Sequence, residues 1–159
     1  MTRRNWKRWQ PATLRDALKG CKDHAQQRHN LSVERIAERM GLEDHWALYK
    51  WIANGRMPLV LVPAYENACG INLVARWMAA TDDKLLVEMP KGRQAQAADM
   101  VELNTGFAQA LQLLTDFYQG GDKPDPEATL AALRQHLEQV AYHHANVSAY
   151  QEPQLEFEA

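Results

Sequence analysis

Residues 31–56 read LSVERIAERMGLEDHWALYKWIANGR, and this stretch decides the fold. Ser32 precedes an apolar stripe with helical spacing over residues 33–40, and its hydroxyl suits a helix cap. Gly41 ends that helix, because a left-handed turn favours a residue without a side chain. A second helix is predicted over residues 43–53, so that two short helices meet at a sharp turn.

The spacing within this stretch is typical of a helix-turn-helix. Ala37 lies four positions before Gly41, and a small residue is needed there because the second helix crosses close by. The pair Asn54-Gly55 then ends the second helix. Alanine and glycine at this spacing also occur in other helical hairpins, so the signal gains its weight from the charge and the helices around it.

The composition limits the class of protein. The chain has 159 residues, of which 46% are hydrophobic, enough for one domain or two small ones with a buried core. It contains neither a run of about 18 apolar residues nor a charged-then-apolar leader, so we expect a cytoplasmic protein without a membrane partner. The two cysteines, Cys21 and Cys69, lack a CxxC partner and are expected to be small buried side chains.

The net charge of −2 conceals two halves of opposite sign. Residues 1–93 hold 16 lysines and arginines against 10 aspartates and glutamates, whereas residues 94–159 hold 2 against 10. All five tryptophans also lie in the basic half. This pattern is expected when one half binds a polyanion and the other half has a different role.

Further helices are predicted around the helix-turn-helix pattern. One begins near Thr13, and two short helices follow over about residues 61–68 and 72–80. The segment 84–90 is predicted to be extended. The first nine residues, MTRRNWKRW, carry four basic side chains without an apolar period and are interpreted as a basic N-terminal arm.

Beyond residue 94 the apolar residues recur at heptad-like spacings of three and four. The first stripe consists of Met100, Leu103, Phe107, Ala110, Leu114 and Phe117. The second consists of Leu130, Leu133, Leu137, Val140, His144 and Val147. The intervening GGDKPDP reverses the chain, so the two helices are predicted to form an antiparallel hairpin. Two helices cannot enclose a core alone, so they must pack on the first half of the chain or on a second copy. A four-helix bundle of two hairpins is the simpler solution, and we expect these stripes to join copies of the chain into a dimer or tetramer.

The predicted fold is therefore mainly α. A five-helix helix-turn-helix DNA-binding domain with the basic arm is expected over residues 1–93, and a helical hairpin for oligomerisation over residues 94–150. Residues 151–159 are acidic and lack an apolar period, so we expect a disordered tail there.

The residue types also resemble those of the CII-like regulatory proteins of temperate phages and prophages, within the wider lambda-repressor-like helix-turn-helix group. The resemblance covers roughly residues 30–93, and its most specific pieces are the helix-turn-helix, YKWIANGRMP and ENACGINLVARW. It implies a five-helix DNA-binding domain, a transcriptional role in the lysis-lysogeny decision or a related prophage function, and an oligomer built by the C-terminal helices. RNA polymerase is a further partner expected in such a role. The interval from Gly41 to Asn54-Gly55 exceeds that of the shortest repressor-type motifs, so individual base contacts are not carried over.

Helix geometry predicts which side chains of the second helix face outward. If Leu48 and Ile52 are buried, then at about 100° per residue Trp46 and Lys50 lie on the opposite face, with Tyr49 at its edge. Cations there suit phosphate or a guanine edge, and aromatic rings suit sugar or thymine methyl groups. The alternative is that Trp46 packs back over the first helix. The predicted core residues of this helix are Leu48, Trp51 and Ile52. The expected DNA-binding residues are His45, Trp46, Tyr49, Lys50, Asn54 and Arg56, with Arg3 and Arg4 of the arm.

No Ser-His-Asp set, glycine-rich phosphate loop or pair of carboxylates is apparent, so we expect no enzymatic activity. His136, His143 and His144 fall near one face of the last helix without a carboxylate or cysteine at ligand spacing, so neither a metal nor a cofactor is expected. The predicted function is sequence-specific binding of double-stranded DNA by a transcriptional regulator. An alternative stays open, in which an adaptor or antitoxin-like protein binds another protein through its acidic hairpin and keeps the helix-turn-helix as a scaffold or autoregulator.

Overall fold

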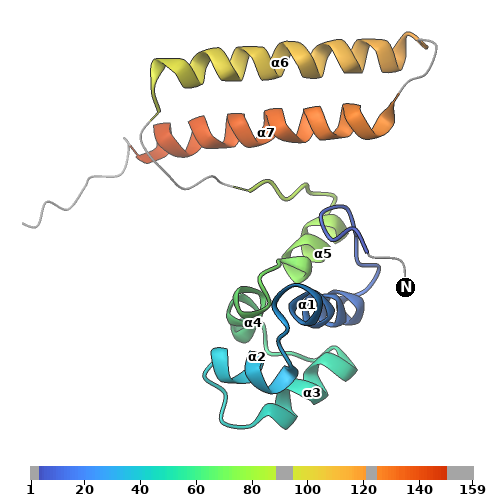
Figure 1. Cartoon of the computed structure of the whole chain (residues 1–159), viewed down its shortest axis with the longest axis vertical. Coiled ribbons are helices and arrows are strands. Elements are labelled where there is room, and N and C mark those ends of the chain that lie inside the picture. The colour runs from blue at the N-terminus through green and yellow to red at the C-terminus, as the bar shows by residue number, and fades with distance from the viewer. Residues whose placement is uncertain (1–3, 89–94, 121–124, 150–159) are drawn as a thin grey trace, which may run out of the picture. The chain divides into compact units, whose positions relative to one another are not determined.

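The computed structural model describes residues 4–88, 95–120 and 125–149 of the chain. Over these residues the chain is mainly helical, with seven α-helices, one short 3-10 helix and no strand (Figure 1). The chain divides into two compact units, Met1–Leu86 and Val87–Ala159. The first unit ends shortly before the domain boundary predicted at residue 93, and the predicted tail over 151–159 lies outside the described residues.

The first unit packs its helices around one core. Its elements are α1 (Leu14–His29), α2 (Val33–Arg39), α3 (His45–Asn54), the 3-10 helix η1 (Leu59–Leu61), α4 (Val62–Cys69) and α5 (Leu73–Thr81). Helix α1 contacts α3, α4 and α5, and α2 contacts α3 and α4. Four helices are present within two residues of their predicted bounds, namely those expected over 33–40, 43–53, 61–68 and 72–80. The segment predicted to be extended is not helical over residues 84–88.

Local sequence explains where α2 and α3 begin and end. Ser32 Oγ accepts the backbone N–H of Arg35 at 3.4 Å and so caps α2. Gly41 has a φ of 70°, and Gly55 has a φ of 75° with its N–H donating to the carbonyl of Trp51 at 2.9 Å. Positive φ is costly for residues that carry a Cβ, so both helices end where a glycine allows the turn. The predicted turn at Gly41 and the predicted stop at Gly55 are confirmed.

The core of the first unit lies where these helices meet. Ala37 is fully buried, which lets neighbouring helices approach α2 closely. Tyr65 donates its hydroxyl hydrogen to the carbonyl of Leu18 at 2.7 Å, so its one polar group is satisfied in the core. Cys21 and Cys69 are free and buried, and burial raises the pKa of both thiols, that of Cys69 to about 12. Both cysteines therefore act as small uncharged side chains, as predicted.

The N-terminal segment belongs to the core from Trp6 onward. Trp6 is only 4% exposed and donates its Nε1 hydrogen to Gln27 Oε1 at 3.1 Å. The guanidinium of Arg76 in α5 donates to the carbonyls of Trp6 and Trp9, at 3.0 and 3.1 Å. The interpretation of these residues as an arm was wrong, because burying two indole rings outweighs the tendency of the basic residues beside them to stay in water.

Arg4 takes part in the same packing. Its guanidinium lies 4.4 Å from the ring centre of Trp9 and 5.1 Å from that of Trp6, within the range of cation–π attraction. Gly20 of α1 admits Trp9, since a Cβ at that position would clash with the indole ring. Arg4 is thus held by Trp6 and Trp9, while Arg3 lies outside the described residues.

The second unit is a pair of long helices, α6 (Ala97–Tyr118) and α7 (Pro126–Ala149). They lie side by side and run in opposite directions (Figure 1). Ala110 is buried at their contact, with Leu103, Leu114 and Leu133 half-buried. The other predicted stripe residues are exposed, namely Met100, Phe107, Phe117, Leu130, Leu137, Val140, His144 and Val147. Part of each heptad stripe therefore lies beside the contact between the two helices and not within it.

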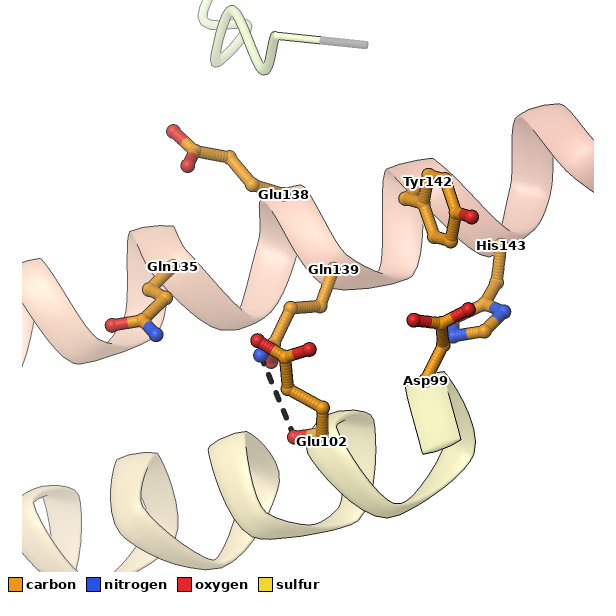
Figure 2. Close-up of a pocket in the computed structure, with 7 residues that line it drawn as sticks. All are labelled: Asp99, Glu102, Gln135, Glu138, Gln139, Tyr142 and His143. Carbon is orange, nitrogen blue, oxygen red and sulfur yellow. Dashed lines mark hydrogen bonds between the residues drawn. The ribbon is translucent and has the colours of Figure 1, made fainter. Parts of the chain in front are cut away.

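Part of the α6–α7 contact is polar, as Figure 2 shows. Gln139 Nε2 donates to the carbonyl of Glu102 at 3.4 Å, whereas Gln139 Oε1 is buried without a hydrogen-bond partner among the described residues. The Asp99 carboxylate accepts the backbone N–H of Gln96 at 2.6 Å and completes a capping box at the start of α6. A buried acceptor without a donor costs about 1–3 kcal/mol, so Gln139 lowers the stability of the helix pair.

Trp6→Ala is expected to destabilise the first unit by about 3–5 kcal/mol, because it removes a buried indole from the core. Trp46→Ala is the matched control: it removes the same side chain from a position that is 63% exposed, and is expected to change stability by less than about 0.5 kcal/mol. Urea unfolding of the full chain, followed by tryptophan fluorescence, measures both variants. Equal losses of stability would contradict the core position of Trp6.

Gln139→Met is expected to raise the unfolding free energy of the α6–α7 pair by about 1 kcal/mol, because it removes the unpaired acceptor and keeps the chain length. Gln135→Met, one turn earlier in α7 at an exposed position, should leave it unchanged. All five tryptophans lie in the first unit, so helix loss seen by circular dichroism without a fluorescence change reports the hairpin. At one fixed protein concentration, a lower midpoint for Gln139→Met than for the unaltered chain would refute this assignment.

Candidate functional site

The outer side of α3 carries the side chains that the helical period predicted to face outward. Leu48 and Ile52 are buried, whereas Trp46 is 63% exposed and Lys50 is also exposed. Trp51, which was predicted to be a core residue, is half-buried and packs against the core. A helix of ten residues that buries one side must leave the other side in water. Trp46 therefore points outward and does not pack back over α1.

His45, Trp46 and Tyr49 form an aromatic cluster at the start of α3. The ring centre of Trp46 lies 5.2 Å from that of His45 and 5.7 Å from that of Tyr49, and the other two are 6.3 Å apart. Asp44 Oδ1 accepts the backbone N–H of Trp46 at 2.8 Å and caps the start of α3. Rings that already contact each other lose little freedom on binding a flat or apolar surface, so the cluster is pre-organised for contact.

A hydrogen bond ties the aromatic cluster to α2. Tyr49 donates its hydroxyl hydrogen to Glu34 Oε1 at 2.8 Å. Hydrogen bonds from the Ser32 side chain, from the backbone N–H of Glu34 itself and from Tyr49 lower the pKa of Glu34 to about 2, so this carboxylate is ionised at neutral pH. Sequence reasoning missed Glu34, because no spacing rule joins residues 15 positions apart across a turn.

Cations lie beside the aromatic cluster in sequence and at the end of α3. Lys50 is exposed on α3, and Arg56 is exposed just beyond it. Asn54 Oδ1 accepts the backbone N–H of Arg56 at 2.8 Å, which fixes the direction in which the chain leaves the helix. Asn54 was predicted to be a DNA-binding residue. Its side-chain oxygen accepts this hydrogen bond within the chain.

Helix α2 adds two arginines that the sequence analysis did not select. Arg35 and Arg39 line a shallow hollow together with Leu31 and Glu38. Both guanidinium groups belong to exposed residues one helical turn apart. Exposed arginines at this spacing suit two neighbouring phosphate groups.

The hairpin has an apolar face beside the α6–α7 contact. The exposed apolar residues of α6 that recur at helical spacing are Met100, Phe107, Leu111 and Tyr118, and those of α7 are Leu130, Leu137 and Val140. At about 100° per residue, each set lies roughly a quarter turn from the side of its helix that contacts the other. Because the helices are antiparallel, both quarter turns lead to the same side of the pair. These residues are called the apolar face below.

The other side of the hairpin is polar and holds a shallow hollow (Figure 2). Its lining residues are Asp99, Glu102, Gln135, Glu138, Gln139, Tyr142 and His143. Figure 2 shows Asp99 of α6 beside His143 of α7, a carboxylate that inspection of α7 alone did not reveal. Within the described ranges no group of three or more His, Cys, Asp or Glu side chains is arranged to hold a metal ion. Nor does any helix there have the length and apolar character to cross a membrane.

Comparison with protein-family models, with curated proteins and with solved structures gave no match. The resemblance to CII-like regulators therefore stays a prediction from the quoted residues. The outer side of α3 and the apolar face of the hairpin are the two candidate functional surfaces. Both are formed by described residues.

Proposed function

We propose that the protein is a sequence-specific, double-stranded DNA-binding transcriptional regulator of phage or prophage type. The observation that carries the proposal is Trp46, an indole that is 63% exposed yet held in contact with His45 and Tyr49. Leaving so much aromatic surface in water is unfavourable, and binding recovers that free energy. The residues that resemble CII-like regulators point to the same class of function.

In this proposal α2 and α3 form a helix-turn-helix, with the outer side of α3 in the major groove. The left-handed turn at Gly41 and the burial of Ala37 support that assignment. Lys50 and Arg56 would meet phosphates or guanine edges, and the aromatic cluster would meet sugars or thymine methyl groups. The arginines of α2 would add contacts to the DNA backbone.

The distribution of charge favours the first unit as the part that binds DNA. Basic residues exceed acidic ones over residues 1–93, and acidic residues exceed basic ones over residues 94–159. A positive field attracts DNA before contact, and a negative field opposes it. The hairpin is therefore assigned a different role.

The apolar face of the hairpin supports a role in assembly. We propose that this face packs against the same face of a second copy of the chain, which would give a four-helix bundle. Burying side chains such as Phe107 and Leu111 would stabilise the bundle by several kcal/mol, at about 25 cal/mol per Å² of apolar surface. Linking two DNA-binding units also raises the effective concentration of the second at a neighbouring half-site. A dimer or tetramer is thus proposed.

A second candidate function follows from the same apolar face, since that face is also suited to binding a different protein. The chain would then be an adaptor or antitoxin-like protein whose first unit serves as a scaffold or autoregulator. Salt dependence separates the two. A DNA-binding regulator loses duplex affinity steeply as salt rises, whereas an adaptor has little duplex affinity at ~0.15 M salt.

Lys50→Ala combined with Arg56→Ala is expected to weaken binding to duplexes selected from a random pool. The cost should be roughly 1–3 kcal/mol for each residue that reads a base, and smaller but uniform across sequences for one that meets only phosphate. Lys19→Ala combined with Lys84→Ala removes the same charge from α1 and from the segment after α5, and serves as the control. Fluorescence anisotropy at several salt concentrations measures both, and unchanged affinity in the first double variant would remove α3 from the interface.

Light scattering on the full chain is expected to give a dimer or tetramer. Leu111→Glu combined with Leu130→Glu should shift it to the monomer, because both residues are at least half exposed and charge on the apolar face opposes its burial. Gln109→Glu combined with Gln135→Glu adds the same charge at exposed polar positions and should leave the assembly intact. A monomeric unaltered chain, or an oligomer that survives the leucine changes, would show that the apolar face does not hold it together.

A further inference from the structure

The hydrogen bond between Tyr49 and Glu34 restricts what this edge of α3 can bind. Tyr49 commits its only hydroxyl hydrogen to Glu34 Oε1, at 2.8 Å, so its oxygen remains as an acceptor alone. Glu34 is an ionised carboxylate and can only accept. The two side chains together therefore offer hydrogen-bond acceptors and no donor.

Glu34 is held in place before any partner arrives. Its Oε1 accepts the hydroxyl hydrogen of Tyr49 at 2.8 Å, which ties the end of the side chain to α3. A carboxylate has about four accepting positions, so Glu34 keeps accepting positions for a partner. A side chain fixed in this way loses little freedom on binding, which favours a specific contact over a loose one.

Only some of the hydrogen-bonding groups on the DNA surface can donate to the Glu34 carboxylate. Phosphate oxygens are negatively charged acceptors, and guanine N7 and O6 and thymine O4 are acceptors in the major groove, so none of them suits Glu34. Exocyclic amino groups do. The adenine amino group lies beside the N7 acceptor of the same base, which repels a carboxylate, whereas cytosine offers its N4 amino group.

We propose that Glu34, positioned by Tyr49, accepts a hydrogen bond from the N4 amino group of a cytosine in the major groove. This inference rests on the proposed function and adds a specificity-determining residue to it. The residue lies on α2, outside the helix proposed to enter the groove, and Tyr49 acts by positioning it.

Selection of bound duplexes from a random pool with the full chain tests this inference. The unaltered chain should select cytosine at one position of its site, with a preference of roughly tenfold or more over other bases. Glu34→Gln places an amide there, which donates and accepts, and that pattern matches the N6 and N7 of adenine. The variant should therefore replace cytosine by adenine at that position and leave the other positions unchanged.

Two further variants distinguish the loss of a base contact from a general effect of charge and from a loss of the fold. Glu38→Gln removes the same charge one turn along α2 and should raise affinity for all sequences equally, with the cytosine preference intact. Tyr49→Phe keeps the ring but frees Glu34, so the cytosine preference should weaken severalfold without a shift to adenine. Far-UV circular dichroism checks that each variant folds.

The outcomes distinguish this inference from the function on which it rests. A chain that binds selected duplexes, with the same base preferred at every position in Glu34→Gln as in the unaltered protein, overturns the role of Glu34 and leaves DNA binding standing. An unaltered chain that selects no sequence overturns both.

Discussion

A short helix that follows directly on a tight turn can bury only one of its sides, and the first unit depends on this constraint. Gly41 turns the chain so that α3 meets α2, and Leu48 is then buried in the core. Every side chain on the other side of α3 must face away from that core. The packing that stabilises the fold is thus also what leaves Trp46 and Lys50 exposed.

The elements that were predicted correctly are those set by local chemistry. Ser32 and Gly41 act within a few residues of themselves through a cap and a left-handed turn, so a single sequence reveals them. Trp6 is different, because the donor to its carbonyl is Arg76, 70 positions later. The basic residues around Trp6 suggested an arm, and only the three-dimensional packing shows that a distant guanidinium satisfies the carbonyls of that segment.

The candidate site also has features that local sequence predicts and features that depend on residues far apart in the chain. A helical period suffices to place Trp46 opposite Leu48, but it contains no information on the partner of Tyr49, which comes from another helix. In the hairpin, the heptad spacing predicted two paired helices without showing which residues would face each other. Leu111 lies outside the predicted stripe yet is part of the apolar face, and Gln139, also outside the stripe, lies at the contact between α6 and α7.

The contact between Arg76 and the N-terminal segment also affects how the protein is made. Synthesis proceeds from the N-terminus, so Trp6 leaves the ribosome long before the residue that ties its carbonyl to α5 has been added. Contacts between residues far apart in sequence form late in folding, because the intervening chain must first be ordered. The carbonyls of Trp6 and Trp9 therefore lack this donor until α5 has been made, and the packing of the N-terminal segment is completed only with the last helix of the first unit.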